Sequence, residues 1–131
     1  MRGTALGLGL AALTATASAA PLDAYRDRVR VLVLSAPDAA DAQLKAQRAA
    51  LGPVRDGVAE RDLVVLEAVG SGAEAQALRA ALGLPADSFR AVLVGKDGGA
   101  KLTAAAPIPP QRLFATIDAM PMRRSETRDR R

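Results

Sequence analysis

The chain has 131 residues, enough for one domain with a single hydrophobic core. Half of the residues are apolar but only 2% are aromatic, so the core must be built from Val, Leu, Ile and Ala. The formal net charge is +4 at pH 7, and the sequence contains neither Cys nor His. These two absences exclude disulfides, thiol redox catalysis, cysteine nucleophiles, the usual zinc sites and the commonest general base.

Residues 1–19 have the pattern of a secretory signal peptide. Arg2 supplies a positive n-region, Ala5–Leu13 an apolar h-region, and Ala17-Ser18-Ala19 a small-residue cleavage motif. The apolar run is shorter than the ~20 residues that a membrane span requires. We therefore expect cleavage after Ala19, export to the periplasm or the extracellular medium, and no stable membrane anchor after cleavage.

The first predicted strand is Arg28–Ser35, whose unbroken apolar run is typical of a central parallel strand buried on both faces. A turn follows, and the next helix is predicted to begin near Pro37 or Asp38 and to end at about Leu51. Gly52 is the predicted C-cap glycine of that helix.

A second cycle of strand and helix comes next. Residues 52–61 are a predicted loop, and Leu63–Val69 is a second strand expected to be buried. Gly70-Ser71-Gly72 is a predicted turn into a helix over Ala73–Leu82, which Gly83 closes.

A β-hairpin and one further helix complete the predicted elements. Phe89–Leu102 contains two short apolar runs separated by a Gly-rich turn, which is typical of a hairpin. The last helix is expected to open at Pro110 or Gln111 and to stop at Pro121. Residues 127–131 are predicted to be a basic, disordered tail, so the folded domain spans residues 20–126.

The element order β-α-β-α-β-β-α predicts an α/β fold with a mixed, four-stranded sheet. Two strands joined through a helix are parallel, and the hairpin adds an antiparallel pair. This order resembles the thioredoxin-like three-layer sandwich, with the strands arranged second–first–third–fourth. In oxidoreductases of that fold a redox cysteine follows the first strand, where this chain has Ala36-Pro37-Asp38-Ala39. The resemblance therefore implies a protein that is neither a thiol oxidoreductase nor a peroxidase.

Three short motifs carry a second resemblance: Glu60–Asp62, Gly95–Gly98 and Ile117–Glu126. They are similar to a domain-of-unknown-function family of small secreted bacterial proteins. Related domains occur in animal sushi-repeat-containing and steroid-sensitive, drought-one-like matrix proteins. The similarity extends over residues 22–126, and Asp118–Arg123 is its most specific part. Membership implies a thioredoxin-like domain without redox cysteines and without an assigned reaction.

The predicted topology places the three motifs at one end of the sheet, opposite the position of a redox site. Asp118 lies in the last turn of its helix, where the helix dipole disfavours an acid, so we expect Lys96, Arg123 or Arg61 to pair with it. The candidate ligand-binding residues at this end are Arg61, Asp62, Lys96, Asp97, Asp118, Arg123, Arg124 and Glu126.

Two functions are compatible with these charges. The first is a secreted, non-catalytic binding or structural module whose partner is an unknown protein or an anionic polymer. Within this function, we favour the interpretation in which the charges are only a salt-bridge cluster that holds the C-terminal segment under the hairpin, over a preorganised charged pocket. We favour the module and expect no cofactor and no bound metal. We also expect no nucleic acid as a partner, since aromatic residues for base stacking are nearly absent.

The alternative is a cryptic enzyme, or a binder of a small anionic ligand, at the same cluster. Asp97, Asp118 or Glu126 would act as acid or base, and Lys96 or Arg123 as an electrostatic clamp. A concave pocket holding an exposed carboxylate with a raised pKa would favour the enzyme. Fully paired charges in a shallow site would favour the module.

Overall fold

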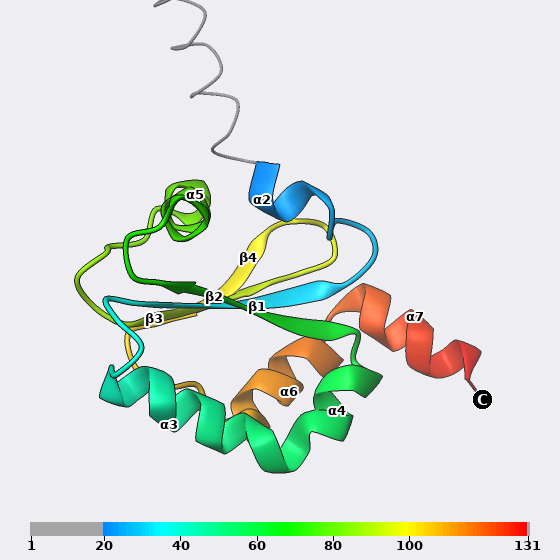
Figure 1. The fold of residues 1–131 in the computed structure, drawn as a ribbon. Helices are drawn as coiled ribbons and strands as arrows, with labels where there is room; N and C mark the ends of the chain where they lie inside the picture. The colour runs from blue at the N-terminus through cyan, green and yellow to red at the C-terminus, as the bar shows by residue number, and fades with distance from the viewer. Residues whose placement is uncertain (1–19, 131) are drawn as a thin grey trace, which may run out of the picture.

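The computed structural model describes residues 20–130 (Figure 1). The predicted signal peptide, residues 1–19, lies outside this part of the chain. The elements follow in the order α2 (Ala20–Asp23), β1 (Arg30–Ala36), α3 (Ala42–Leu51), the 3-10 turn η1 (Gly52–Val54), α4 (Arg55–Glu60), β2 (Leu63–Val69), α5 (Ala73–Leu82), β3 (Arg90–Val94), β4 (Ala100–Ala104), α6 (Pro110–Asp118) and α7 (Pro121–Asp129).

The four strands form one mixed sheet in the order β2-β1-β3-β4, which confirms the predicted order. β1 pairs with β2 in parallel and with β3 antiparallel, and β3 pairs antiparallel with β4. Arg30 is opposite Leu63 on one side, and Val31 is opposite Val94 on the other. The first residues of β1 and β2 therefore lie at the same end of the sheet as the last residue of β3.

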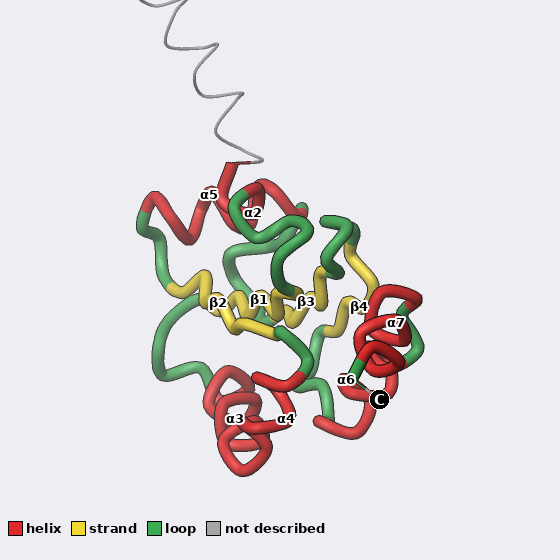
Figure 2. The backbone as a smooth tube through the Cα atoms, turned by 90° about the vertical axis from the view of Figure 1, so that its right-hand side faces the viewer, coloured by secondary structure: helices red, strands yellow, loops and turns green. Residues whose placement is uncertain are grey.

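Helices cover both faces of the sheet. α2 and α5 lie on one face and α3, α4 and α6 on the other, as the two perpendicular views show (Figures 1 and 2). β1 is buried along its whole length, as predicted. Leu32 packs into the core cluster that contains Leu44 of α3 and Leu113 of α6, while Val33 belongs to the cluster next to Leu82 of α5. Each fully buried side chain of this size contributes about 1.5–3 kcal/mol, so the central strand anchors both layers.

The prediction that β2 is a fully buried strand is wrong. Leu63 and Ala68 are buried, but the residues between them are half-buried or exposed, and the Val65 side chain is 38% exposed. β2 is one of the two outer strands and has a neighbour on one side only. A run of Val and Leu therefore marks a strand but does not fix its place in the sheet.

The predicted loop at residues 52–61 is also wrong. α3 begins at Ala42, four or five residues later than expected, with the Asp41 carboxylate as N-cap. Gly52 has a helical φ of −51°, and the chain continues through η1 into α4. Val54 and Val58 pack against the core below the sheet, and this burial stabilises a helix that the local Gly-Pro sequence disfavours.

A further helix replaces the disordered tail that we expected from residue 127. α6 ends at Asp118, before Pro121 as predicted, but Pro121 opens α7 at its first position. Proline is well tolerated there because its missing N–H would have no partner within the helix. α7 ends at Asp129, and Arg123 on its inner side is only 2% exposed.

Candidate functional site

A network of charged side chains lies at the end of the sheet where β1 and β2 begin, here called the charged end. The segment before β2 and the segment after β3 both reach it because of the strand register. The end of α6 and the first turns of α7 complete it. Its ion pairs join Arg30, Glu60, Arg61, Asp62, Lys96, Asp118, Arg123 and Glu126.

Glu126 connects α7 with β1 and with the hairpin. Its Oε1 accepts a hydrogen bond from Arg30 Nη1 at 3.2 Å, and its Oε2 accepts from Arg30 Nη2 at 3.1 Å. Lys96 Nζ donates to the same Oε2 at 2.8 Å and to Asp62 at 2.9 Å. The Arg30 side chain is 0% exposed and that of Lys96 10%, so one carboxylate compensates two cations that water barely reaches.

Asp118 connects α6 with the segment before β2. It accepts from Arg61 Nε and Nη2, both at 3.0 Å, and from Arg123 Nε at 3.3 Å. The expected cationic partner of Asp118 is therefore present, and it is Arg61 with Arg123 rather than Lys96. The Arg61 guanidinium also lies 4.1 Å above the ring of Phe114, and Arg123 Nη2 donates to Glu60 at 2.7 Å.

These partners lower the pKa of the two central carboxyl groups. The hydrogen bond from Arg61 lowers the pKa of Asp118, against burial, which acts to raise it. For Glu126, burial acts to raise the pKa, but the hydrogen bonds from Arg30 and Lys96 outweigh it, and the pKa falls below its usual value. Both groups are therefore ionised at neutral pH, and neither holds a proton for general acid catalysis.

Two of the predicted site residues lie outside this network. Asp97 accepts from Lys101 Nζ at 2.7 Å and from the Gly99 N–H at 2.9 Å within the hairpin turn. The hydrogen bond from Lys101, followed by that from Gly99, lowers the pKa of Asp97. Arg124 is exposed on the outer side of α7.

Two residues of the network were not among the candidate ligand-binding residues, Arg30 and Glu60. Arg30 is the only charged residue of β1, and a charge on a strand buried on both faces requires a partner. That pattern was visible in the sequence and would have marked Arg30 as a member of an ionic site. Glu60 belongs to the motif Glu60–Asp62, which was expected at this end of the sheet, and the structure pairs its 55% exposed side chain with Arg123, which is 3% exposed.

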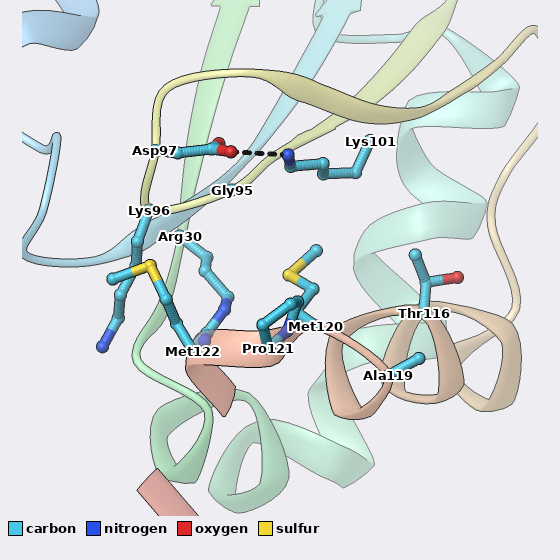
Figure 3. Close-up of a pocket in the computed structure, with 10 residues that line it drawn as sticks. All are labelled: Arg30, Gly95, Lys96, Asp97, Lys101, Thr116, Ala119, Met120, Pro121 and Met122. Atoms are coloured by element: carbon cyan, nitrogen blue, oxygen red, sulfur yellow. Dashed lines mark hydrogen bonds and ion pairs between the residues drawn. The ribbon is translucent and has the colours of Figure 1, made fainter. Parts of the chain in front are cut away.

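A pocket of about 380 Å³ adjoins the charged end, between the hairpin and the junction of α6 with α7 (Figure 3). Ionic groups from β1 and the hairpin line one side, and mostly apolar groups from the helix junction line the other. Asp97 and Lys101 face each other across an ion pair at its rim. The lining includes Arg30, Lys96, Asp97, Lys101, Ala119, Met120, Pro121 and Met122.

The opposite end of the sheet contains a buried arginine. Arg79 of α5 is 5% exposed, and its Nε donates to Ser35 Oγ at 2.9 Å. Its other nitrogens donate to the carbonyls of Gly70 at 2.7 Å, Ala36 at 2.9 Å and Ala68 at 3.0 Å. This guanidinium satisfies the backbone where β1 and β2 finish, so its role is structural.

Among residues 20–130, no group of three or more His, Cys, Asp and Glu side chains is arranged to hold a metal ion. The helices described here are all too short or too polar to cross a membrane.

Comparisons with known proteins place the chain in a family. A family model described as a domain of unknown function, DUF4174, matches residues 21–126. The sushi repeat-containing protein SRPX of Rattus norvegicus and that of Homo sapiens are each 32% identical to the chain. Each match covers 83% of this chain and 26% of the relative, so the chain spans about a quarter of these relatives' length. The family match includes every residue of the charged network, and the chain belongs to the DUF4174 family.

Proposed function

We propose that this protein is an exported, thioredoxin-like module that binds a ligand or partner at its charged end without catalysing a reaction. The observation that carries the proposal concerns Asp97, Asp118 and Glu126, the three carboxylates that would act as acid or base in a cryptic enzyme. Each of them accepts a hydrogen bond from a cationic side chain, and each has a lowered pKa. Such groups are arranged for recognition and cohesion rather than for proton transfer.

The thioredoxin-like assignment is supported by the connectivity and by the layers. The strand order β2-β1-β3-β4, with the parallel pair next to the hairpin, is the order expected for that fold. The end of the sheet that carries the redox site in thioredoxin-like oxidoreductases is occupied here by the hydrogen-bonded Arg79. The signal-peptide pattern of residues 1–19 supports export.

Binding at the charged end is supported by the pocket beside the network. A salt-bridge cluster that only holds α7 in place requires no concave apolar surface next to it. Here the cluster borders a pocket whose helix side is largely apolar, and Met122 at its edge is 43% exposed. Pockets that combine an apolar wall with a few fixed polar groups are typical of ligand sites.

The enzyme alternative receives less support. Asp97 does lie in a concave pocket and its side chain is 58% exposed, which meets the geometric condition for a catalytic carboxylate. Its pKa is lowered rather than raised, because Lys101 and the Gly99 N–H hold its charged form. A general acid or base poised near neutral pH would need the opposite shift.

Heteronuclear NMR titration of the nitrogen-15-labelled protein tests the proposal. The probes are soluble metabolites, dipeptides and sulfated oligosaccharides, and shifts are mapped onto the backbone amides. We expect at least one probe to shift amides of the charged end, with Arg48→Ala, on the surface of α3, as a control that behaves like wild type. Shifts confined to other surfaces would contradict the proposal. Turnover of a probe that disappears in Asp97→Asn would replace it with the enzyme alternative.

A further inference from the structure

We infer that the pocket between the hairpin and the α6–α7 junction binds a small organic carboxylate with an apolar body. The inference rests on the proposed function and names the ligand class for the same end of the molecule. Three features meet in this pocket: a buried Arg30 N–H without an acceptor, the uncapped first turn of α7, and an apolar wall that includes two methionines.

The first feature is an incomplete guanidinium. The terminal nitrogens of Arg30 donate to Glu126 and to the carbonyl of Arg61 at 2.8 Å. The side chain is 0% exposed and lines the pocket. Its Nε is buried and has no hydrogen-bond partner in the structure. Buried polar groups almost always have a hydrogen-bond partner, so we expect a ligand to supply an acceptor oxygen for this N–H. Figure 3 shows the Arg30 side chain along the pocket, between Lys96 and Met120.

The second feature is the beginning of α7. This nine-residue helix starts at the pocket, and no side chain accepts a hydrogen bond at its N-cap, Met120. The first backbone N–H groups of a helix have no carbonyl partner within the helix, and the helix dipole places positive potential there. The N–H groups of Met122 and Arg123 belong to this first turn. A carboxylate next to Arg30 Nε would be favoured by the same potential.

The third feature is the wall opposite the ionic groups. Ala119, Met120, Pro121 and Met122 supply an apolar surface at the helix junction. Met122 is exposed by 43% although it is large and apolar, and methionine adapts its shape to varied ligands. The volume of about 380 Å³ lies within the roughly 300–1,000 Å³ common for small-molecule sites.

The charges around the pocket select a singly charged ligand. Lys96 is already compensated by Asp62 and Glu126, and Lys101 by Asp97. One free guanidinium N–H and one helix terminus remain, which is little for a doubly charged phosphate but suits one carboxylate. The apolar body would then lie along Met120 and Met122.

The test uses 4-phenylbutyrate as the probe, with 4-phenylbutyramide as its neutral match and acetate as the head group alone. Arginine Nε–H signals are resolved in heteronuclear NMR spectra, so the readout is the Arg30 Nε–H signal together with the amides of Met122 and Arg123. We expect a saturable shift of these signals with 4-phenylbutyrate and binding at least about tenfold weaker for the amide and for acetate. The amide lacks the charged acceptor that strengthens each hydrogen bond, and acetate lacks the body that contacts the apolar wall. Equal affinity for the amide, or shifts that leave the Arg30 signal in place, would overturn the inference.

Two glutamate substitutions provide a matched pair of variants. Met122→Glu places a negative charge at the apolar wall and should weaken binding by about tenfold or more. Val65→Glu introduces the same charge at a side chain of similar exposure, 38%, which does not line the pocket, and should bind like wild type. Equal loss in both variants would overturn the inference. If 4-phenylbutyrate fails while another probe shifts the charged end, the carboxylate inference falls and the binding module stands; if no probe shifts that end, both fall.

Discussion

The substitution Glu126→Gln tests whether one carboxylate holds α7 against the sheet. Gln keeps the shape of the side chain but removes the charge that faces Arg30 and Lys96. It can still accept one hydrogen bond through its amide oxygen. The guanidinium of Arg30 would then remain in a place where its side chain is 0% exposed, with no counter-charge in direct contact.

The expected cost follows from that burial. Removing one partner of a buried ion pair typically costs about 3–5 kcal/mol, because the remaining charge stays uncompensated. Glu126 itself is 20% exposed, and Gln keeps one acceptor, so the lower limit applies. We expect the free energy of unfolding to fall by about 3 kcal/mol, which for a domain of this size lowers the melting temperature by about 12 °C.

Urea unfolding followed by circular dichroism measures this change, and Glu67→Gln is the control. Glu67 accepts from Arg48 Nε at 2.8 Å, but the two side chains are 31% and 44% exposed, so their pair is a surface one. Its loss should cost no more than about 1 kcal/mol. A loss of less than about 1 kcal/mol in Glu126→Gln as well would show that the buried network does not stabilise the fold.

Four further outcomes follow from the structure. Asp118→Ala should lower the melting temperature by about 4 °C, since the carboxylate is 46% exposed, and an unchanged value in differential scanning fluorimetry would argue against a structural cluster. The pKa values of Asp118 and Glu126 are lowered from 3.8 and 4.5, so these carboxylates stabilise the fold fully above about pH 4.5 and lose that effect as the pH falls. Urea midpoints measured from pH 7 to pH 3 should show this decline. The decline should be smaller in Glu126→Gln. Gly98→Ala should lower the free energy of unfolding in urea by about 1–2 kcal/mol, because φ is +86° and the new Cβ would lie 2.7 Å from Arg26 Nε. Gly52→Ala is the control and should not destabilise, because Gly52 has a helical φ and open space around it. Arg79→Leu should cost about 4 kcal/mol by leaving buried carbonyls unsatisfied, and wild-type stability on thermal unfolding would refute the structural role.

The sequence by itself determined those elements whose signals are local. Leu63–Val69 and Ala73–Leu82 have the predicted bounds, and Gly83 has the left-handed φ of 67° that its place after a helix predicts. The hairpin and the start of α6 at Pro110 are also as predicted. In each case the deciding interactions join residues a few positions apart, so an apolar period and a glycine or proline suffice.

The meeting of the charged segments was predictable for a different reason. Once the strand order is known, the direction of each strand decides which loops share an end of the sheet. That argument correctly brought Arg61, Lys96, Asp118 and Glu126 together. It brought Asp97 to the same end but did not predict that Asp97 stays outside the ion-pair network, because Lys101 and the Gly99 N–H satisfy that carboxylate within the hairpin.

Only the tertiary structure decided the rest. α4 forms where Gly and Pro disfavour a helix, because the half-buried Val54 and Val58 pack against the core cluster. Arg30 and Glu126 are 96 positions apart, and Arg30 lines a pocket together with residues of the hairpin and of the α6–α7 junction, three separate parts of the chain. No local pattern encodes such a site, because its energy depends on where the packed sheet and helices hold each side chain.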